Sequence, residues 1–246
     1  MGISACWKDC QKRKMNNSFQ LFLLERDDRK DLSKDREVLI RQAALSYGVS
    51  ENELQSEKIC RSKTGKPFFE KLDIHFSISH SESLWACLMG PFNCGLDVQY
   101  VKPCNFAKIA GRFFSEREKE YVKGSGLDGF FDIWVRREAF GKYTGEGFFG
   151  HMPEFVTEEN SLAMYLAVPC GEIRSENPIQ FETPVRFGTL VRFETPFVGD
   201  KIKCAVCIPA EAGGECTDGT DAVGKARNSS EPSVKIVSDW KKGEKI

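Results

Sequence analysis

The sequence predicts an α+β fold, and three observations carry that prediction. The chain has 246 residues, enough for one large domain or two small, closely coupled lobes. Hydrophobic residues make up 41% of the chain and charged residues 29%, so a packed core can form. Stretches with the two-residue alternation of strands precede and follow a stretch with helical periodicity.

The N-terminal part is expected to contain one strand and two helices. Residues 19–24 form an apolar run that suits a strand, and residues 34–47 place their apolar side chains on one helical face. Ser33 can cap the start of this helix, and Gly48 suits the left-handed position that ends it. A capping-box pattern beginning at Ser50 predicts a short second helix.

The next stretch is rich in strand patterns. Residues 73–79 and 94–100 alternate between apolar and polar side chains, and residues 84–89 form a short apolar run between them. In the second alternating segment, Asp97 and Gln99 fall on the same face because they are two residues apart. We therefore expect three neighbouring strands, the last of which carries two polar side chains.

The central helical stretch is expected to form two helices. A capping box at Ser115 opens the first, over residues 115–122. The second, over residues 130–143, is apolar nearly all round and should be buried. Strands and turns are expected over 155–208, and the composition of residues 209–232 predicts a flexible linker.

Composition and charge argue against several classes of function. The net charge is −1, which argues against a general nucleic-acid binder. No apolar run approaches the roughly 20 residues of a membrane-spanning helix. The first 15 residues are polar and basic rather than a signal segment, so a cytoplasmic protein is expected.

Ten cysteines raise the question of a metal or redox site. Cys204 and Cys207 form a lone CxxC within a strand pattern, whereas zinc sites usually need two such pairs or nearby histidines. We therefore interpret the cysteines as small core-filling side chains.

Two groups of charged or polar residues could carry chemistry. Asp97 and Gln99, joined by one more carboxylate, would suit Mg²⁺, although a strand with one polar face is also ordinary. Trp134, Glu138 and Lys142 lie four residues apart on one helical stripe. Glu138 and Lys142 could form a simple surface ion pair, but their helix is expected to be buried, and buried charges need partners or a function.

A third group is Ser77, Ser79, His80 and Ser81 at a strand end. A Ser–His pair invites a hydrolase hypothesis. However, the chain has no Gly-x-Ser-x-Gly elbow, and adjacent residues rarely have the geometry of nucleophile and base. Hydroxyls and one imidazole at this place are better suited to binding phosphate.

Taken in order, these motifs resemble the 4′-phosphopantetheinyl transferases, in particular the larger, surfactin-type members. The resemblance covers residues 33–150 well and the strands to about Cys207 loosely. The motifs are Gly65-Lys66-Pro67, Phe76-Ser-Ile-Ser79-His80-Ser81, Gly95-Leu-Asp97-Val-Gln99, Phe113-Phe114-Ser115-Glu116, and Trp134 to Lys142 followed by Gly145-Glu-Gly147.

The resemblance implies a fold of two similar lobes, each a small, mainly antiparallel sheet packed against helices. The lobes would span residues 1–93 and 94–208, with a linker and tail over 209–246. Coenzyme A and Mg²⁺ would lie in the cleft between the lobes, and the protein would be a monomer. The implied reaction transfers 4′-phosphopantetheine from coenzyme A to a serine of an apo acyl- or peptidyl-carrier protein and releases 3′,5′-ADP.

The resemblance also implies roles for particular residues. Asp97, Gln99 and Glu138 would bind Mg²⁺. Glu138 would also accept the proton of the carrier serine, and Lys142 would neutralise phosphate charge. The residues that would bind coenzyme A are Arg36, Lys66, Ser79 and His80.

This chain departs from the family pattern at two places. The family usually has Asp-x-Glu where this chain has Asp97-Val-Gln99, so the site carries one negative charge fewer. The common Lys-Glu-Ser of the helix is Arg137-Glu138-Ala139 here. The first departure leaves an alternative open, namely a non-catalytic protein that binds coenzyme A or a carrier and has an impaired metal site.

Overall fold

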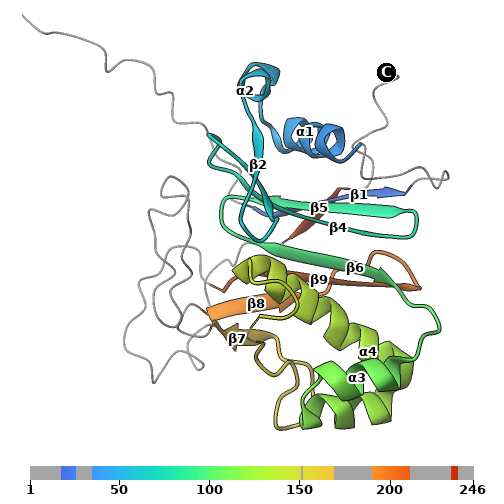
Figure 1. Ribbon diagram of the computed structural model, residues 1–246. Coiled ribbons are helices and arrows are strands. Elements are labelled where there is room, and N and C mark those ends of the chain that lie inside the picture. The colour runs from blue at the N-terminus through green and yellow to red at the C-terminus, as the bar shows by residue number, and fades with distance from the viewer. Residues whose placement is uncertain (1–17, 26–34, 151, 169–189, 211–233, 238–246) are drawn as a thin grey trace, which may run out of the picture.

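The structure is a computed structural model that describes residues 18–25, 35–150, 152–168, 190–210 and 234–237 (Figure 1). In chain order, its elements are β1 Gln20–Glu25, α1 Arg36–Tyr47, α2 Glu51–Gln55, β2 Ile59–Arg61, β3 Pro67–Phe69, β4 His75–Ser81, β5 Leu84–Gly90, β6 Gly95–Tyr100, α3 Phe106–Phe113, α4 Glu116–Thr144, β7 Tyr165–Ala167, β8 Leu190–Glu194, β9 Ile202–Pro209 and β10 Lys235–Val237.

The described strands form two four-stranded sheets and one small hairpin. The first sheet has the order β10-β1-β5-β4, the second has the order β6-β9-β8-β7, and β2 pairs with β3. Within the described residues, the pairings are antiparallel except that β10 runs parallel to β1. The edge strands β4 and β6 therefore belong to different sheets.

The elements are arranged in four layers (Figure 1). Helix α1 packs on the outer face of the first sheet through a core that includes Leu39, Ile40 and Trp85. Helix α4 packs on the outer face of the second sheet. The inner faces of the two sheets share a third core, which includes Leu88 of β5 and Val206 of β9. Burial of apolar surface thus holds each helix on its sheet and the two sheets on each other.

The ends of the N-terminal helices follow local sequence signals. Helix α1 ends at Gly48, which has φ of +108°, as predicted from the glycine. It begins at Arg36 rather than at residue 34, and its N-cap is Asp35 without a side-chain cap bond. Ser33, the predicted cap, lies outside the described residues. The capping box of α2, from Ser50 to Glu53, is confirmed.

Helix α4 joins the two helices that were predicted separately. It begins at the expected Ser115 capping box and ends at Gly145, which has φ of +78°. Gly126 interrupts it with φ of +64° and ψ of −143°, so the helical axis changes direction within the glycine-rich stretch 124–129. The predicted break was therefore placed correctly, but it is a kink inside one element rather than a loop.

The predicted α+β class, with antiparallel sheets packed against helices, is confirmed. The division into two similar lobes at 93/94 stays a prediction. Within the predicted tail 209–246, residues 235–237 form β10; residues 211–233 and 238–246 lie outside the described residues. No described helix is long and apolar enough to cross a membrane.

The cysteines on β9 fill the core, as expected. Cys204 belongs to the core between the sheets, whereas Cys207 belongs to the core under α4, so the two thiols face opposite sides of the strand. Burial raises the pKa of Cys207. Among the described residues, no group of three or more His, Cys, Asp or Glu side chains is placed to hold a metal ion.

Candidate active site

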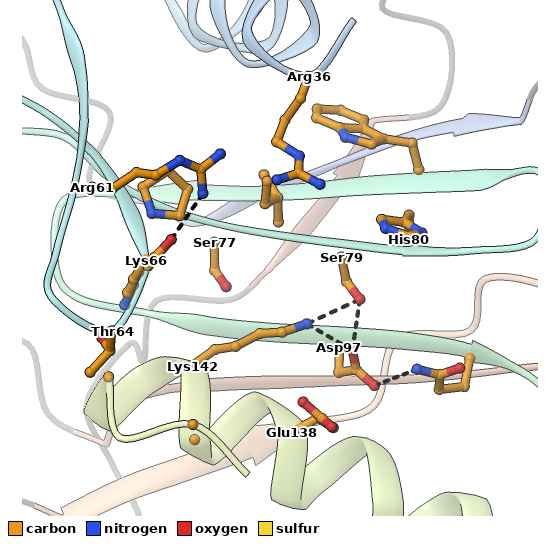
Figure 2. A pocket seen from close by; sticks show the side chains of 18 residues that line it. Arg36, Arg61, Thr64, Lys66, Ser77, Ser79, His80, Asp97, Glu138 and Lys142 are labelled. Carbon is orange, nitrogen blue, oxygen red and sulfur yellow. Dashed lines mark hydrogen bonds and ion pairs between the residues drawn. The ribbon is translucent and has the colours of Figure 1, made fainter. Parts of the chain in front are cut away.

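A cavity of about 410 Å³ lies where α1, the β2–β3 hairpin, β4, β6 and the C-terminal half of α4 converge. Its lining includes all eight residues that the sequence singled out for metal, catalysis or coenzyme A, and Figure 2 shows most of them around the opening. These residues are Arg36, Lys66, Ser79, His80, Asp97, Gln99, Glu138 and Lys142. The fold thus brings together side chains that are more than 100 positions apart in the chain.

Asp97 is the best-anchored carboxylate of the cavity, with only 3% of its side chain exposed. Its Oδ1 accepts hydrogen bonds from Ser79 Oγ at 2.7 Å and from Lys142 Nζ at 2.8 Å. The Lys142 ammonium also donates to Ser79 Oγ at 3.1 Å and to the carbonyl of Leu96 at 2.9 Å. Three protein acceptors therefore fix the cation of Lys142 beside Asp97.

Glu138 reaches the same place from α4. The helix can approach β6 closely because Gly95 has no side chain; a Cβ there would lie 1.9 Å from the carbonyl oxygen of Ala139. Figure 2 shows the Glu138 carboxylate below Asp97. Burial and the negative charge of Asp97 raise the pKa of Glu138, while Lys142 opposes that rise. The alternative of a simple surface ion pair between Glu138 and Lys142 is not found among the described residues, because Lys142 bonds to Asp97.

Gln99 lies beside the carboxylate pair, with its amide nitrogen toward Asp97. Gln99 Nε2 donates to Asp97 Oδ2 at 3.3 Å, and Gln99 Oε1 accepts from Ser81 Oγ at 3.4 Å. The amide oxygen therefore faces Ser81 in this arrangement. That Gln99 is a metal ligand stays a prediction.

Lys66 is held at the junction between the two sheets. Its ammonium donates to Asn93 Oδ1 at 2.7 Å and to the carbonyl of Cys94 at 2.9 Å. Asn93 in turn donates to the carbonyl of Tyr143 at the end of α4, at 2.7 Å. Burial lowers the pKa of Lys66, and burial together with the Lys66 charge lowers the pKa of His75 to about 4, so His75 is neutral at physiological pH.

Other basic side chains lie on the rim of the cavity. Arg36 projects from α1 toward β4, and His80 is exposed on β4 (Figure 2). Arg61 also lines the cavity, and its guanidinium donates to the carbonyl of Gly65 at 3.1 Å. Sequence reasoning missed Arg61 and its neighbour Thr64. The signal was available, because both lie in the short polar segment that leads to Gly65-Lys66-Pro67.

The hydrolase hypothesis does not fit this geometry. Ser79 and His80 are consecutive on β4, so their side chains lie on opposite faces of the strand. Ser79 is buried against Asp97 and Lys142, whereas His80 is exposed. Within the described part of the chain, the Ser79 hydroxyl therefore has no imidazole base beside it.

A second charged pair stabilises the same helix outside the cavity. Arg137 Nη1 donates to both carboxylate oxygens of Glu118, at 2.8 and 3.1 Å. Glu118 is fully buried and also accepts the backbone N–H groups of Ser115 and Phe155. The guanidinium of Arg137 lies 5.3–5.9 Å from the ring centroids of Phe114, Phe148 and Phe155. Trp134 packs its ring against Phe148, as expected of a packing residue.

The carboxylates suit a hard divalent cation. Mg²⁺ in proteins usually binds one or two carboxylates and completes its coordination with waters and substrate phosphates. Asp97 Oδ2 has a single, long protein donor at 3.3 Å, and no hydrogen bond to Glu138 is found within the described part of the chain. Burial, and to a smaller extent the negative charge of Asp97, raise the pKa of Glu138, so the two carboxylates lie close enough to interact. These residues fit Mg²⁺.

The fold and this site resemble those expected of the 4′-phosphopantetheinyl transferase superfamily. Residues 93–181 match the model of that superfamily, and this stretch carries Asp97, Gln99, Glu138 and Lys142. The resemblance found in the motifs is thereby confirmed.

Parts of the chain are also similar to individual 4′-phosphopantetheinyl transferases. The chain is 30% identical over 130 residues to the 4′-phosphopantetheinyl transferase gsp of Aneurinibacillus migulanus, covering 50% of this chain and 52% of that protein. It is 33% identical over 110 residues to a 4′-phosphopantetheinyl transferase of Bacillus subtilis, covering 43% of each chain. It is 31% identical over 117 residues to Sfp of Bacillus subtilis strain 168, covering 45% of this chain and 50% of Sfp. The matched part thus spans about half the length of these relatives.

Proposed function

We propose that this protein transfers 4′-phosphopantetheine from coenzyme A to a serine of an apo acyl- or peptidyl-carrier protein, releasing 3′,5′-ADP. The single observation that supports this best is the cavity in which Asp97, Glu138 and Lys142 meet beneath a basic rim. Such a cavity suits a ligand that carries a pyrophosphate and a further phosphate. The relatives named above are 4′-phosphopantetheinyl transferases. The superfamily model matches the stretch that supplies these three residues.

Asp97 and Glu138 would hold Mg²⁺, with Gln99 or a water beside them. When bound, the cation would supply charge neutralisation at the pyrophosphate, which is the main requirement of phosphoryl transfer. Asp97 is suited to this role because Ser79 and Lys142 fix its Oδ1 and leave Oδ2 toward the cavity. Glu138 approaches from the facing helix, so the two carboxylates come from separate elements.

Glu138 would also accept the proton of the carrier serine, directly or through a water. The serine oxygen forms the new bond to the β-phosphorus of coenzyme A, the bond from that phosphorus to the bridging oxygen breaks, and 3′,5′-ADP departs. The raised pKa of Glu138 makes its carboxylate a stronger proton acceptor than an exposed glutamate.

Lys142 would neutralise negative charge that develops on the departing phosphate. Arg36 and His80 on the rim would bind coenzyme A phosphates, and we add Arg61 to this group because it lines the same rim. Lys66 and Ser79 were also predicted to contact coenzyme A. Since both groups already have protein partners, we propose that they meet the ligand from those anchored positions.

We further propose that the protein acts as a cytoplasmic monomer whose partner is a carrier protein and not a nucleic acid or a membrane. The six described cysteines carry free thiols, as expected in a reducing compartment. Both walls of the cavity come from one chain, and the net charge of −1 gives no general attraction to nucleic acid.

A second candidate function is a non-catalytic protein that binds coenzyme A or a carrier. Gln99 favours it, because a neutral amide stands where the family pattern usually has a second carboxylate on the strand. In this case, divalent cations would bind too weakly for transfer, although the basic rim would still bind phosphates.

The direct test is intact-protein mass spectrometry of an apo carrier protein incubated with this protein and coenzyme A. The expected result is a mass gain of one phosphopantetheine with Mg²⁺ and none with a chelator. A carrier whose acceptor serine is replaced by alanine is the control. No gain on peptidyl and acyl carriers alike, together with measurable coenzyme A binding, would contradict transfer and favour the binding protein.

A further inference from the structure

Strands β4 and β6 lie side by side although they are edge strands of different sheets (Figure 1). A strand that pairs on one side only leaves every second N–H and C=O group of its other side without a partner strand. β6 pairs with β9 along its whole length, so its other edge faces β4. That edge lies in the interior of the molecule, where an unpaired backbone group is costly.

Serine hydroxyls of β4 accept hydrogen bonds from the N–H groups of this edge. The bonded residues are spaced two apart along both strands. The bonds run from Leu96 N–H to Ser77 Oγ at 3.0 Å, from Val98 N–H to Ser79 Oγ at 3.3 Å, and from Tyr100 N–H to Ser81 Oγ at 2.9 Å. All three serines are buried, with 2%, 6% and 8% of their surface exposed. We call these three serines and their bonds the serine seam.

Two carbonyl groups of the same edge accept hydrogen bonds from two lysines of the cavity. Lys66 Nζ donates to the carbonyl of Cys94 and Lys142 Nζ donates to the carbonyl of Leu96, each at 2.9 Å. The edge of β6 therefore determines where both ammonium groups stand. Any shift of β6 along β4 would move Asp97, Lys66 and Lys142 together.

We propose that Ser77 and Ser81 are positioning residues that hold β6 in register with β4 and thereby keep Asp97 and Lys142 in place for the divalent cation. This proposal rests on the proposed function, because the cation is what gives the position of Asp97 its importance. Ser77 acts through the N–H next to Asp97, at Leu96. Ser81 acts through Tyr100 N–H and also donates to the amide oxygen of Gln99. Ser79 contacts Asp97 directly and is left unchanged in the test.

The test compares two double variants that have the same shape and differ in the hydroxyl. Ser77→Thr with Ser81→Thr keeps both hydroxyls, whereas Ser77→Val with Ser81→Val removes them and adds the same bulk. The first readout is amide hydrogen exchange at Leu96 and Tyr100. Relative to the threonine variant, the valine variant should exchange at least about fivefold faster at these two sites, as expected for the loss of one hydrogen bond. Equal exchange rates in the two variants would show that the hydroxyls do not protect these N–H groups, and would overturn the proposal.

The second readout is the affinity for Mn²⁺ alone, measured by calorimetry without coenzyme A or carrier. The valine variant should bind Mn²⁺ about tenfold more weakly than the threonine variant, as is typical when outer partners of a metal site are lost. Faster exchange with unchanged Mn²⁺ affinity would show that the seam only stabilises the fold, and it would overturn the positioning role. Ser161→Val is the control, because Ser161 bonds to Thr157 in an exposed turn away from β6.

The experiment includes a replacement variant and uses readouts that do not depend on transfer. Should the valine variant fail to fold, Ser77→Ala with Ser81→Ala removes the hydroxyls without adding atoms and is held to the same two readouts. Neither readout requires transfer. If the wild type modifies no carrier protein, the proposed function fails, whereas the exchange and Mn²⁺ results still support or overturn the seam.

Discussion

Two ion pairs of the same helix show how differently buried charge can be used. Arg137 and Glu118 bond to each other, and the remaining acceptor capacity of Glu118 is filled by two backbone N–H groups. Lys142 and Asp97 also bond to each other, but Asp97 keeps one oxygen with only a single 3.3 Å contact, and Glu138 stands beside it with a raised pKa. We call the first pair complete because the carboxylate of Glu118 is fully hydrogen-bonded, although Arg137 Nε has no partner among the described residues. The second pair is incomplete and can accept a cation and a phosphate.

The largest expected effect is on stability, at the complete pair. Glu118→Gln leaves Arg137 as a buried charge without its counter-ion, which should cost about 3–5 kcal/mol. Thermal unfolding should then occur about 10 °C lower. Glu116→Gln is the matched control, because the carboxylate of Glu116 pairs with Lys119 at the surface with 92% exposure and should matter little. A wild-type unfolding temperature for Glu118→Gln would contradict the structural role.

The next effect is on activity, at the incomplete pair. Lys142→Met keeps the length of the side chain and removes its charge from Asp97 and from the phosphates. Transfer should fall about 10²- to 10³-fold in kcat, with a smaller change in KM for coenzyme A. Lys123→Met, on the exposed part of the same helix, should leave the rate unchanged. A loss confined to KM would show that Lys142 binds coenzyme A without acting in the reaction itself.

A smaller effect is expected from completing the family pattern. Gln99→Glu adds a carboxylate next to Asp97, at the place where the amide nitrogen now lies at 3.3 Å. The affinity for Mg²⁺, measured by calorimetry, should rise about tenfold, because the affinity of such sites grows with ligand charge. Gln55→Glu, exposed on α2, controls for added charge. Activity that appears only in Gln99→Glu would favour the binding protein over the enzyme.

The smallest effect is the pH dependence of cation binding. Burial and Asp97 raise the pKa of Glu138 above its ordinary value of 4.5, so its carboxylate takes up a proton earlier as the pH falls. Since the cation needs the ionised form, Mn²⁺ affinity should begin to fall at a pH above that ordinary value. Without metal, the same raised pKa makes ionised Glu138 a burden on folding at neutral pH, and this burden is relieved as the pH falls. A midpoint at or below 4.5 would contradict the buried pair.

Much of this arrangement could be predicted because it depends on short-range signals. Capping boxes fixed the starts of α2 and α4, and strand alternation placed Asp97 and Gln99 on one face. What the sequence could not reveal was long-range. The bond between Lys142 and Asp97 joins residues 45 positions apart, and that between Arg137 and Glu118 spans 19. Helical spacing suggested Glu138 as a partner of Lys142. Because α4 approaches β6 closely at Gly95, Lys142 bonds to Asp97 instead.

The contacts of the serine side chains on β4 also could not be predicted from the sequence. Ser77 and Ser81 belong to the motif that suggested phosphate binding, yet their hydroxyls bond to the backbone of β6. Hydroxyl groups suit either role, and only the placement of one sheet edge against the other decides between them. Arg61, at the end of β2, lies next to the Gly65-Lys66-Pro67 motif in the sequence, but only the folded hairpin shows that its side chain lines the cavity.

The most direct test of the central claim is the intact-mass transfer assay on Glu138→Gln, run together with its thermal unfolding. The substitution keeps the shape of the side chain. It removes the negative charge of Glu138, which would bind the cation and accept the proton of the carrier serine. The expected result is no phosphopantetheine gain on the carrier, with an unfolding temperature equal to or above that of the wild type. Transfer at the wild-type rate by Glu138→Gln would contradict the account.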